Sequence, residues 1–276
     1  MNKTLRKAMI STIAMLVVAV MSLTGVTYAW FTQGTEAKVE GMQMSVQAAD
    51  GGIQVSKDGV NWANLITLTA EDGNIREGVM PVSTVNAENF FKATIDRTND
   101  KKITTVALTP EEYAANIWEE EIWIRNTGST EITVNLGDTA FVSKDARKVN
   151  QAAKLAVFKI TEEVDEETQE TSESLELLYI FSDENYKGVK EASETSFEYA
   201  SSGSATQIST PTKLQTSAGD CTITIPAGEV NDAGVLEAIV KIKIVVWVEG
   251  QDAQCVNQNA ASSFDLNLFF KNANAN

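Results

Sequence analysis

Cys221 and Cys255 are the only thiols in the chain, and the sequence contains no histidine. The missing histidine excludes Ser–His and Cys–His nucleophile pairs, HExxH zinc sites and every metal centre that depends on imidazole. A zinc site built on the two cysteines would need further Cys or His ligands that the chain lacks. We therefore predict no catalytic residue, no metal site and no cofactor, and we expect the protein not to be an enzyme.

Carboxylates are abundant, and they cluster in two places. The segment 161–174 holds seven acidic and no basic residues, but it lacks the Gly-punctuated Asp spacing of a dedicated calcium loop. A solvated acidic loop is the interpretation we favour there over a calcium site. Glu119, Glu120 and Glu121 would place two carboxylates on one face of a strand and one on the other. Nothing in the sequence raises the pKa of one over its neighbour, so we expect a solvated strand face rather than an acid–base pair.

Four tryptophans, Trp62, Trp118, Trp123 and Trp247, lie in strand-like segments. They would either form a sugar-binding platform or pack in a core and against cross-strand partners, which is the commoner use of strand aromatics.

The first 29 residues have the three parts of a secretory signal peptide. Basic residues up to Lys7 precede an apolar run from Ala8 to Leu23, and Thr27 and Ala29 are the small residues before a cut that leaves Trp30 first. The apolar run has about 16 residues, short of the roughly 20 that span a bilayer. We expect cleavage, a secreted or cell-surface protein, and membrane contact only through the uncleaved signal.

The expected export bears on the net charge of the mature chain and on the state of its two cysteines. Removing the three basic residues of the signal changes the net charge from −16 to −19, and so acidic a surface is a poor partner for nucleic acid. An even pair of cysteines in an exported protein most simply forms one disulfide, here Cys221–Cys255. The alternative is two buried thiols.

Period-2 alternation of apolar and polar residues recurs along the mature chain and predicts many short strands. One apolar and one polar face per strand is typical of antiparallel sheets. We therefore expect an all-β fold, an antiparallel jelly-roll-like β-sandwich with long loops. The segments that carry the pattern are 118–125, 132–136, 221–225, 240–249 and 264–271.

Turn and helix signals complete the outline. Asp58-Gly59 predicts a hairpin joining 53–55 to 60–62, because Asp-Gly supplies the positive φ of primed turns. Thr109-Pro110-Glu111-Glu112 predicts a short helix over about 110–117, and 139–153 is a weaker second helix. The acidic segment is expected to link strands 155–160 and 175–181 as a hairpin insertion. With no repeat and no boundary, we expect one domain over 42–276, after the signal at 1–29 and a segment at 30–41.

Three short segments carry a family pattern: the processing site at 24–32 with the strand-like segment 39–48, the strand 121–128 with its Asn-x-Gly end, and 246–255 with its Trp-Val-Glu-Gly-Gln-Asp run. Together they resemble the TasA/camelysin family of exported proteins of Gram-positive bacteria, and the third segment is similar to clostridial relatives. Residues 140–215 resemble the family poorly, and the chain departs from TasA in its two cysteines and its acidic insertion.

The resemblance implies a jelly-roll subunit of extracellular biofilm-matrix fibres, released by a SipW-type signal peptidase. It implies that the freed segment from Trp30 to about Gly41 adds as a donor strand to the next copy, with Trp30, Phe31 and Val39 as apolar anchors. Such a head-to-tail contact propagates into a homopolymer. The alternatives are a segment that folds back onto its own sheet and a monomeric surface module that binds a glycan or another ligand. The camelysin protease label is not carried over, because the chain has no His.

Overall fold

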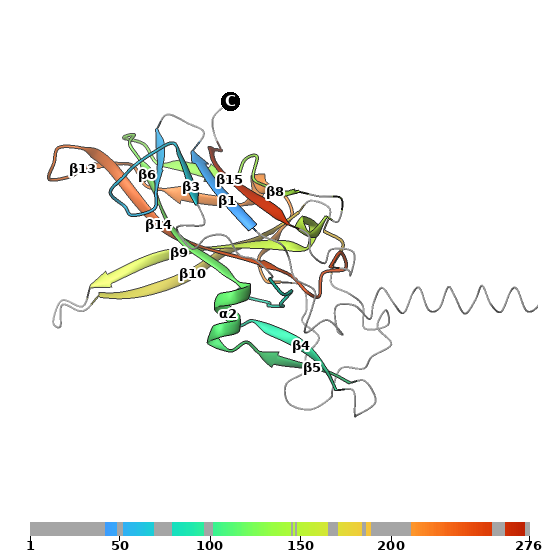
Figure 1. Cartoon of the computed structure of the whole chain (residues 1–276). Coiled ribbons are helices and arrows are strands. Elements are labelled where there is room, and N and C mark those ends of the chain that lie inside the picture. The colour runs from blue at the N-terminus through green and yellow to red at the C-terminus, as the bar shows by residue number, and fades with distance from the viewer. Residues whose placement is uncertain are drawn as a thin grey trace, which may run out of the picture.

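The computed structural model describes residues 42–48, 52–68, 79–96, 102–144, 146, 148–164, 171–183, 186–188, 211–255 and 263–273. Within these residues the fold is all-β, with one short α-helix and 3-10 turns, as the alternation predicts (Figure 1).

The first sheet has six strands, in the order β12-β7-β15-β1-β3, with β8 paired beside β15. Its centre is β15, which runs parallel to β1 and antiparallel to β7 and β8. The parallel pair departs from the expected antiparallel sheet, because strands from opposite ends of the chain are not constrained by a hairpin. The bounds are β1 Met42–Ala48, β3 Leu65–Leu68, β7 Ile132–Asn135, β8 Ala140–Ser143, β12 Thr222–Ile225 and β15 Phe264–Asn272.

The second sheet has seven strands, in the order β11-β10-β9-β14-β6-β2, with β13 paired to β14. The strands β9 and β10 form the expected hairpin and extend beyond the body of the sheets (Figure 1). The expected loop over 161–174 is wrong in its bounds: residues 161–164 and 171–174 continue the two strands, with Thr171 opposite Val164, because cross-strand hydrogen bonds extend the pairing. The bounds are β2 Ile53–Ser56, β6 Trp118–Asn126, β9 Ala153–Val164, β10 Thr171–Ser182, β11 Leu214–Gln215, β13 Glu229–Val230 and β14 Leu236–Val248.

One large core joins the two sheets. It contains alternate residues of β15 from the first sheet, such as Phe264 and Leu268, and alternate residues of β14 from the second, such as Ile242 and Val246. The apolar phase of both strands was correctly predicted, because side chains of a strand point alternately to opposite faces.

A second, smaller core covers part of the other face of the seven-stranded sheet. Val245 and Trp247 of β14 lie there with Phe158 of β9 and Phe90 of the segment that precedes β4. The residues that cover this face come from the segment 82–90 and from Leu108, Tyr113 and Ile117, in and around the helix α2 (Pro110–Asn116). The strands β4 (Phe91–Asp96) and β5 (Lys102–Ala107) form a separate two-stranded hairpin between these two segments. Burial on both faces explains why the apolar residues Val245 and Trp247 interrupt the otherwise polar side of β14.

The helix α2 begins where the sequence predicts. The Thr109 hydroxyl accepts the N–H of Glu112, the Glu112 carboxylate accepts the N–H of Thr109, and Pro110 occupies the first turn. The expected second helix over 139–153 is wrong: that segment contains β8 and the 3-10 turn η2 (Val149–Ala152), with Phe141 and Val149 in the large core. The pairing of β8 with β15 determines the structure of this segment, because the helix propensity of its residues is too weak to compete with tertiary contacts.

Replacing Thr109 by Ala is expected to lower the free energy of unfolding by about 1 kcal/mol, because one N-terminal N–H of α2 loses its acceptor. Urea unfolding of wild type and variant measures the change. The matched control Thr130→Ala, on an exposed loop, is expected to leave the unfolding midpoint unchanged. Equal effects of the two changes would contradict the assignment of the cap.

Candidate functional site

The residues predicted for processing and strand donation lie outside the described part of the chain. These are Thr27, Ala29 and Trp30 at the cleavage site and Trp30, Phe31 and Val39 in the donor segment. The described chain begins with β1, which enters the first sheet between β15 and β3.

Cys221 and Cys255 are present as two buried thiols that belong to the same large core. The thiol of Cys221 lies 3.6 Å from the carbonyl oxygen of Ser217, and burial raises its pKa to about 12. The structure therefore corresponds to the alternative of two thiols, and the disulfide stays a prediction.

In the reduced protein, Cys221 is expected to resist alkylation, because a thiol and not a thiolate is present at neutral pH and no solvent reaches it. Iodoacetamide labelling before and after denaturation, read by mass spectrometry, measures this. Failure to label after denaturation without a reductant would instead show the disulfide. Rapid labelling of the folded protein would contradict the burial of Cys221.

The tryptophans do not gather on one exposed surface. Trp118 and Trp247 are buried, one in each core. Trp62 and Trp123 are half-buried, and cations of the same sheet lie over their rings, Arg125 at 4.5 Å and Lys241 at 5.2 Å from the ring centres. The four therefore do not form the sugar-binding platform that was considered.

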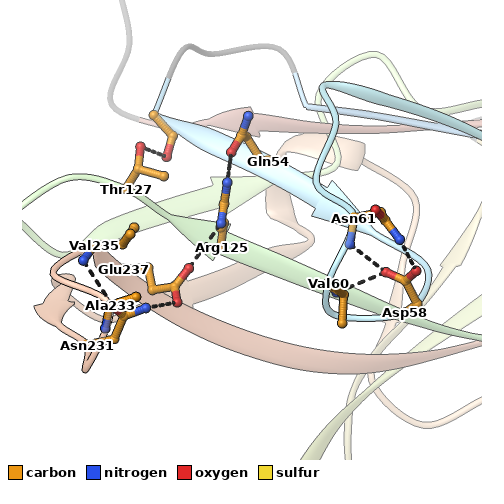
Figure 2. Close-up of polar contacts among 11 residues, drawn as sticks. Gln54, Asp58, Val60, Asn61, Arg125, Thr127, Asn231, Ala233, Val235 and Glu237 are labelled. Atoms are coloured by element: carbon orange, nitrogen blue, oxygen red, sulfur yellow. Dashed lines mark hydrogen bonds and ion pairs between the residues drawn. The ribbon is translucent and has the colours of Figure 1, made fainter.

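Arg125 ties three strands together beside Trp62. Figure 2 shows its guanidinium between Gln54 of β2 and Glu237 of β14, with N–O distances of 2.9 Å from Nε to Gln54 and 3.1 Å from Nη1 to Glu237. Asn231 also donates to Glu237, at 2.6 Å, from the turn before β14. These side chains satisfy one another, which favours a structural role for this surface.

The Asp58 turn has the predicted Gly59 at φ +70 but a shorter second arm than expected. Residues 60–62 do not form a strand; instead Ala63 makes an isolated bridge to Val55. The Asp58 carboxylate accepts the N–H groups of Asn61 at 2.7 Å and Val60 at 2.9 Å (Figure 2). These hydrogen bonds, led by that from Asn61, hold the pKa of Asp58 well below its usual range.

The acidic strand residues are paired with lysines. Glu119 and Glu121 share the outer face of β6, as predicted, and lie 2.8 Å from Lys243 and 3.1 Å from Lys241 of β14. Lys241 also lies 2.8 Å from Glu173 on the acidic hairpin, and this hydrogen bond is the main cause that raises the pKa of Lys241. The surface is a cross-strand ion-pair ladder, which differs from the free carboxylates that acid–base chemistry needs.

The clearest site for an added strand is the edge strand β12. Within the described residues β12 pairs only with β7. The carbonyl of Thr133 accepts the N–H of Ala273 on the β15 side, and Leu136 donates to Cys221 on the β12 side. Since backbone groups alternate in direction along a strand, Thr222 and Thr224 direct their N–H and C=O groups to the open side of β12.

A pocket of about 630 Å³ borders the start of this strand. It is lined by residues 137–141 after β7, by residues 216–219 before β12, and by Phe181 and Asp183. Phe141 and Phe181 contribute stacked rings whose centres are 5.8 Å apart. The volume lies within the range of small-ligand pockets.

No family model, no curated protein and no solved structure matches this chain. Within the described residues, no three acidic or sulfur side chains gather to hold a metal ion. None of the helices in that part of the chain is long and apolar enough to cross a membrane.

Proposed function

We propose that this chain is a secreted structural subunit of an extracellular surface or biofilm-matrix fibre. After a signal peptidase of the SipW type removes residues 1–29, segment 30–41 of one copy adds as a strand to the next copy. The resulting contact is heterologous, so each subunit both donates and accepts, and the assembly grows head to tail. The proposed activity is assembly rather than catalysis.

The observation that carries the proposal is the edge of β12, which has one partner strand among the described residues, beside the pocket lined by Phe141 and Phe181. An incoming strand would pair its main chain with Thr222 and Thr224, and main-chain hydrogen bonds of this kind provide affinity without sequence specificity. The pocket would supply specificity by taking an aromatic side chain of the donor, Trp30 or Phe31. Edge strands left unprotected are sites of association in many β-proteins.

We further propose that the two sheets form the jelly-roll-like β-sandwich expected from the sequence. The shared core between β14 and β15 supports this arrangement, since sandwiches bury the inner faces of two sheets against one another.

The test compares two purified chains, one beginning at Trp30 and one beginning at Met42, by electron microscopy and sedimentation. The longer chain is expected to form filaments and the shorter one to remain monomeric. Mixing the shorter chain with a peptide of residues 30–41 should show binding. Filaments of the Met42 chain equal to those of the Trp30 chain would exclude donor-strand assembly.

A matched pair of variants tests the acceptor edge. Thr224→Pro removes an outward N–H from β12, whereas Thr224→Val keeps that N–H and the strand propensity. We expect only the proline variant to lose filaments, with both variants folded by circular dichroism. Normal filaments from Thr224→Pro would place the acceptor elsewhere.

A further inference from the structure

A lysine and an aspartate are fully buried together at one end of the second core. Lys154 lies in β9 and Asp252 follows β14, and neither side chain is exposed to solvent. The Lys154 Nζ and Asp252 Oδ2 atoms are 2.5 Å apart, and 98 positions separate the two residues in the chain. A buried ion pair is costly to desolvate and adds little stability over apolar side chains of similar size, so its presence invites a chemical explanation.

The register of β9 and β14 brings the two residues together. Lys154 is directly opposite Trp247 on the neighbouring strand, and the N–H of Glu249 donates to the carbonyl of Ala152. The chain then turns, with the N–H of Asp252 donating to the carbonyl of Glu249. This turn returns the Asp252 carboxylate to the Lys154 amine.

One aromatic ring and one backbone donor contact the pair. The ring centre of Tyr186 lies 4.8 Å from Lys154 Nζ, and Trp247 is completely buried. The second carboxylate oxygen of Asp252 accepts the N–H of Gln254 at 2.8 Å, which fixes the orientation of the carboxyl group. The amine and the carboxyl are thus held in one geometry without solvent between them.

A second buried carboxyl belongs to the same cluster. Glu249 accepts hydrogen bonds from Trp247 Nε1 at 3.0 Å, from the N–H of Gln251 at 3.0 Å and from the N–H of Thr84 at 3.3 Å. Burial raises the pKa of Glu249. Its N–H donates to the carbonyl of Ala152, two residues before Lys154, and its carbonyl accepts the N–H of Asp252, so this buried carboxyl belongs to the same corner of the sheet as the Lys154–Asp252 pair.

We propose that Lys154 and Asp252 become joined by an amide bond between Nζ and Cγ, formed by the folded chain itself with Glu249 as proton carrier. Transfer of a proton within the pair gives a neutral amine and a neutral carboxylic acid. The amine attacks Cγ, one C–N bond forms, one C–O bond breaks, and the oxygen leaves as water. Glu249 takes the proton from nitrogen, returns one to the leaving oxygen and ends in its starting state.

The site supplies what this condensation needs. Fixed orientation replaces an encounter in solution, and effective molarities for well-oriented groups are on the order of 10⁵ M or more. Burial keeps away the water that would hydrolyse the product. Nothing is oxidised or reduced, and no co-reactant is required.

Mass spectrometry of the denatured chain from Trp30 onward tests the proposal. The wild type is expected to be lighter than its sequence by one water, and digestion should yield two peptides joined through Lys154 and Asp252. Dehydration at an Asp-Gly pair such as Asp58-Gly59 would give the same mass, so the joined peptides are the deciding observation. A wild type of full mass, or a lost water without joined peptides, would overturn the proposal.

Variants separate the bond from the role of Glu249. Lys154→Arg keeps a positive charge beside Asp252 but replaces the amine, and it is expected to have full mass. Glu249→Gln keeps the size and acceptor oxygen of the side chain, and it is expected to fold cooperatively yet remain mostly at full mass. If Glu249→Gln forms the cross-link at the wild-type rate, Glu249 is not the proton carrier. If Lys154→Arg still loses a water, the dehydration does not involve the Lys154 amine, and the proposal is wrong.

Discussion

Replacing Trp247 by Ala will lower the free energy of unfolding by about 3–5 kcal/mol. Trp247 has no solvent exposure, its ring meets that of Phe90 edge to face with centres 5.4 Å apart, and its Nε1 donates to Glu249. The change leaves a cavity in the second core and removes a hydrogen bond from a buried carboxyl. Urea unfolding followed by circular dichroism measures the loss.

The control for this prediction is Trp123→Ala, on the neighbouring strand β6. Trp123 is half-buried, and its ring interacts with Lys241 rather than with a core. We expect a loss of about 1 kcal/mol, the scale of a surface cation–π contact. Equal losses for the two tryptophans would mean that the segment 82–90 and the helix α2 do not cover Trp247 in solution.

The single variant Lys154→Met will be about 3–5 kcal/mol less stable than the double variant Lys154→Met/Asp252→Leu. The single change leaves the Asp252 carboxylate buried without its ammonium, whereas the double change removes both charges. Neither variant can form the proposed amide bond, so the comparison isolates the cost of the unpaired carboxylate. Denaturant unfolding of the two proteins side by side provides the measurement.

The partly exposed pair Lys243–Glu119 is the control for the buried pair. Its atoms are 2.8 Å apart, but the lysine side chain is 23% and the glutamate side chain 32% exposed. Lys243→Met is expected to cost less than about 1 kcal/mol relative to wild type. If the Lys154 single and double variants were equally stable, the Asp252 carboxylate would not be buried in solution.

The proposed amide bond has a consequence for the stability of the wild type, whereas the proposed fibre assembly has none. An amide bond across 98 positions would add about 4–5 kcal/mol on the loop-entropy estimate used for disulfides. The Lys154→Met/Asp252→Leu variant would then be less stable than wild type by about that amount even though its core is apolar. In the proposed assembly, filament formation depends on β12 and the N-terminal segment, so loss of the amide bond and loss of filaments are separable.

Local patterns in the sequence determined the strands and their inner faces. The alternation of 264–271 and 240–248 predicted β15 and β14 and the residues of each in the large core, because a strand repeats every two residues. The helix α2 was predicted from Thr109, Pro110 and Glu112, whose capping interactions span only a few residues. The pairing of the strands on either side of the acidic segment was correctly predicted, but the expected loop over 161–174 was too long, because residues 161–164 and 171–174 belong to β9 and β10.

The sequence could not show which strands would be neighbours across long separations. The parallel pairing of β1 with β15, the single-partner edge of β12 and the pocket beside it depend on contacts between distant segments. No local pattern predicts such contacts, because pairing distant segments costs loop-closure entropy that only the contacts of the whole assembled core offset.

The tertiary structure alone decided the chemistry of the 247–252 segment. In the sequence, Lys154, Glu249 and Asp252 are three charged residues, and no local pattern marks them for burial. The segment 82–90 pairs with and packs on the end of β14, so the same three residues lie without solvent around an amine–carboxyl contact. Burial changes the energetics of a charge far more than its position in a sequence pattern does, and burial is a property of the assembled layers.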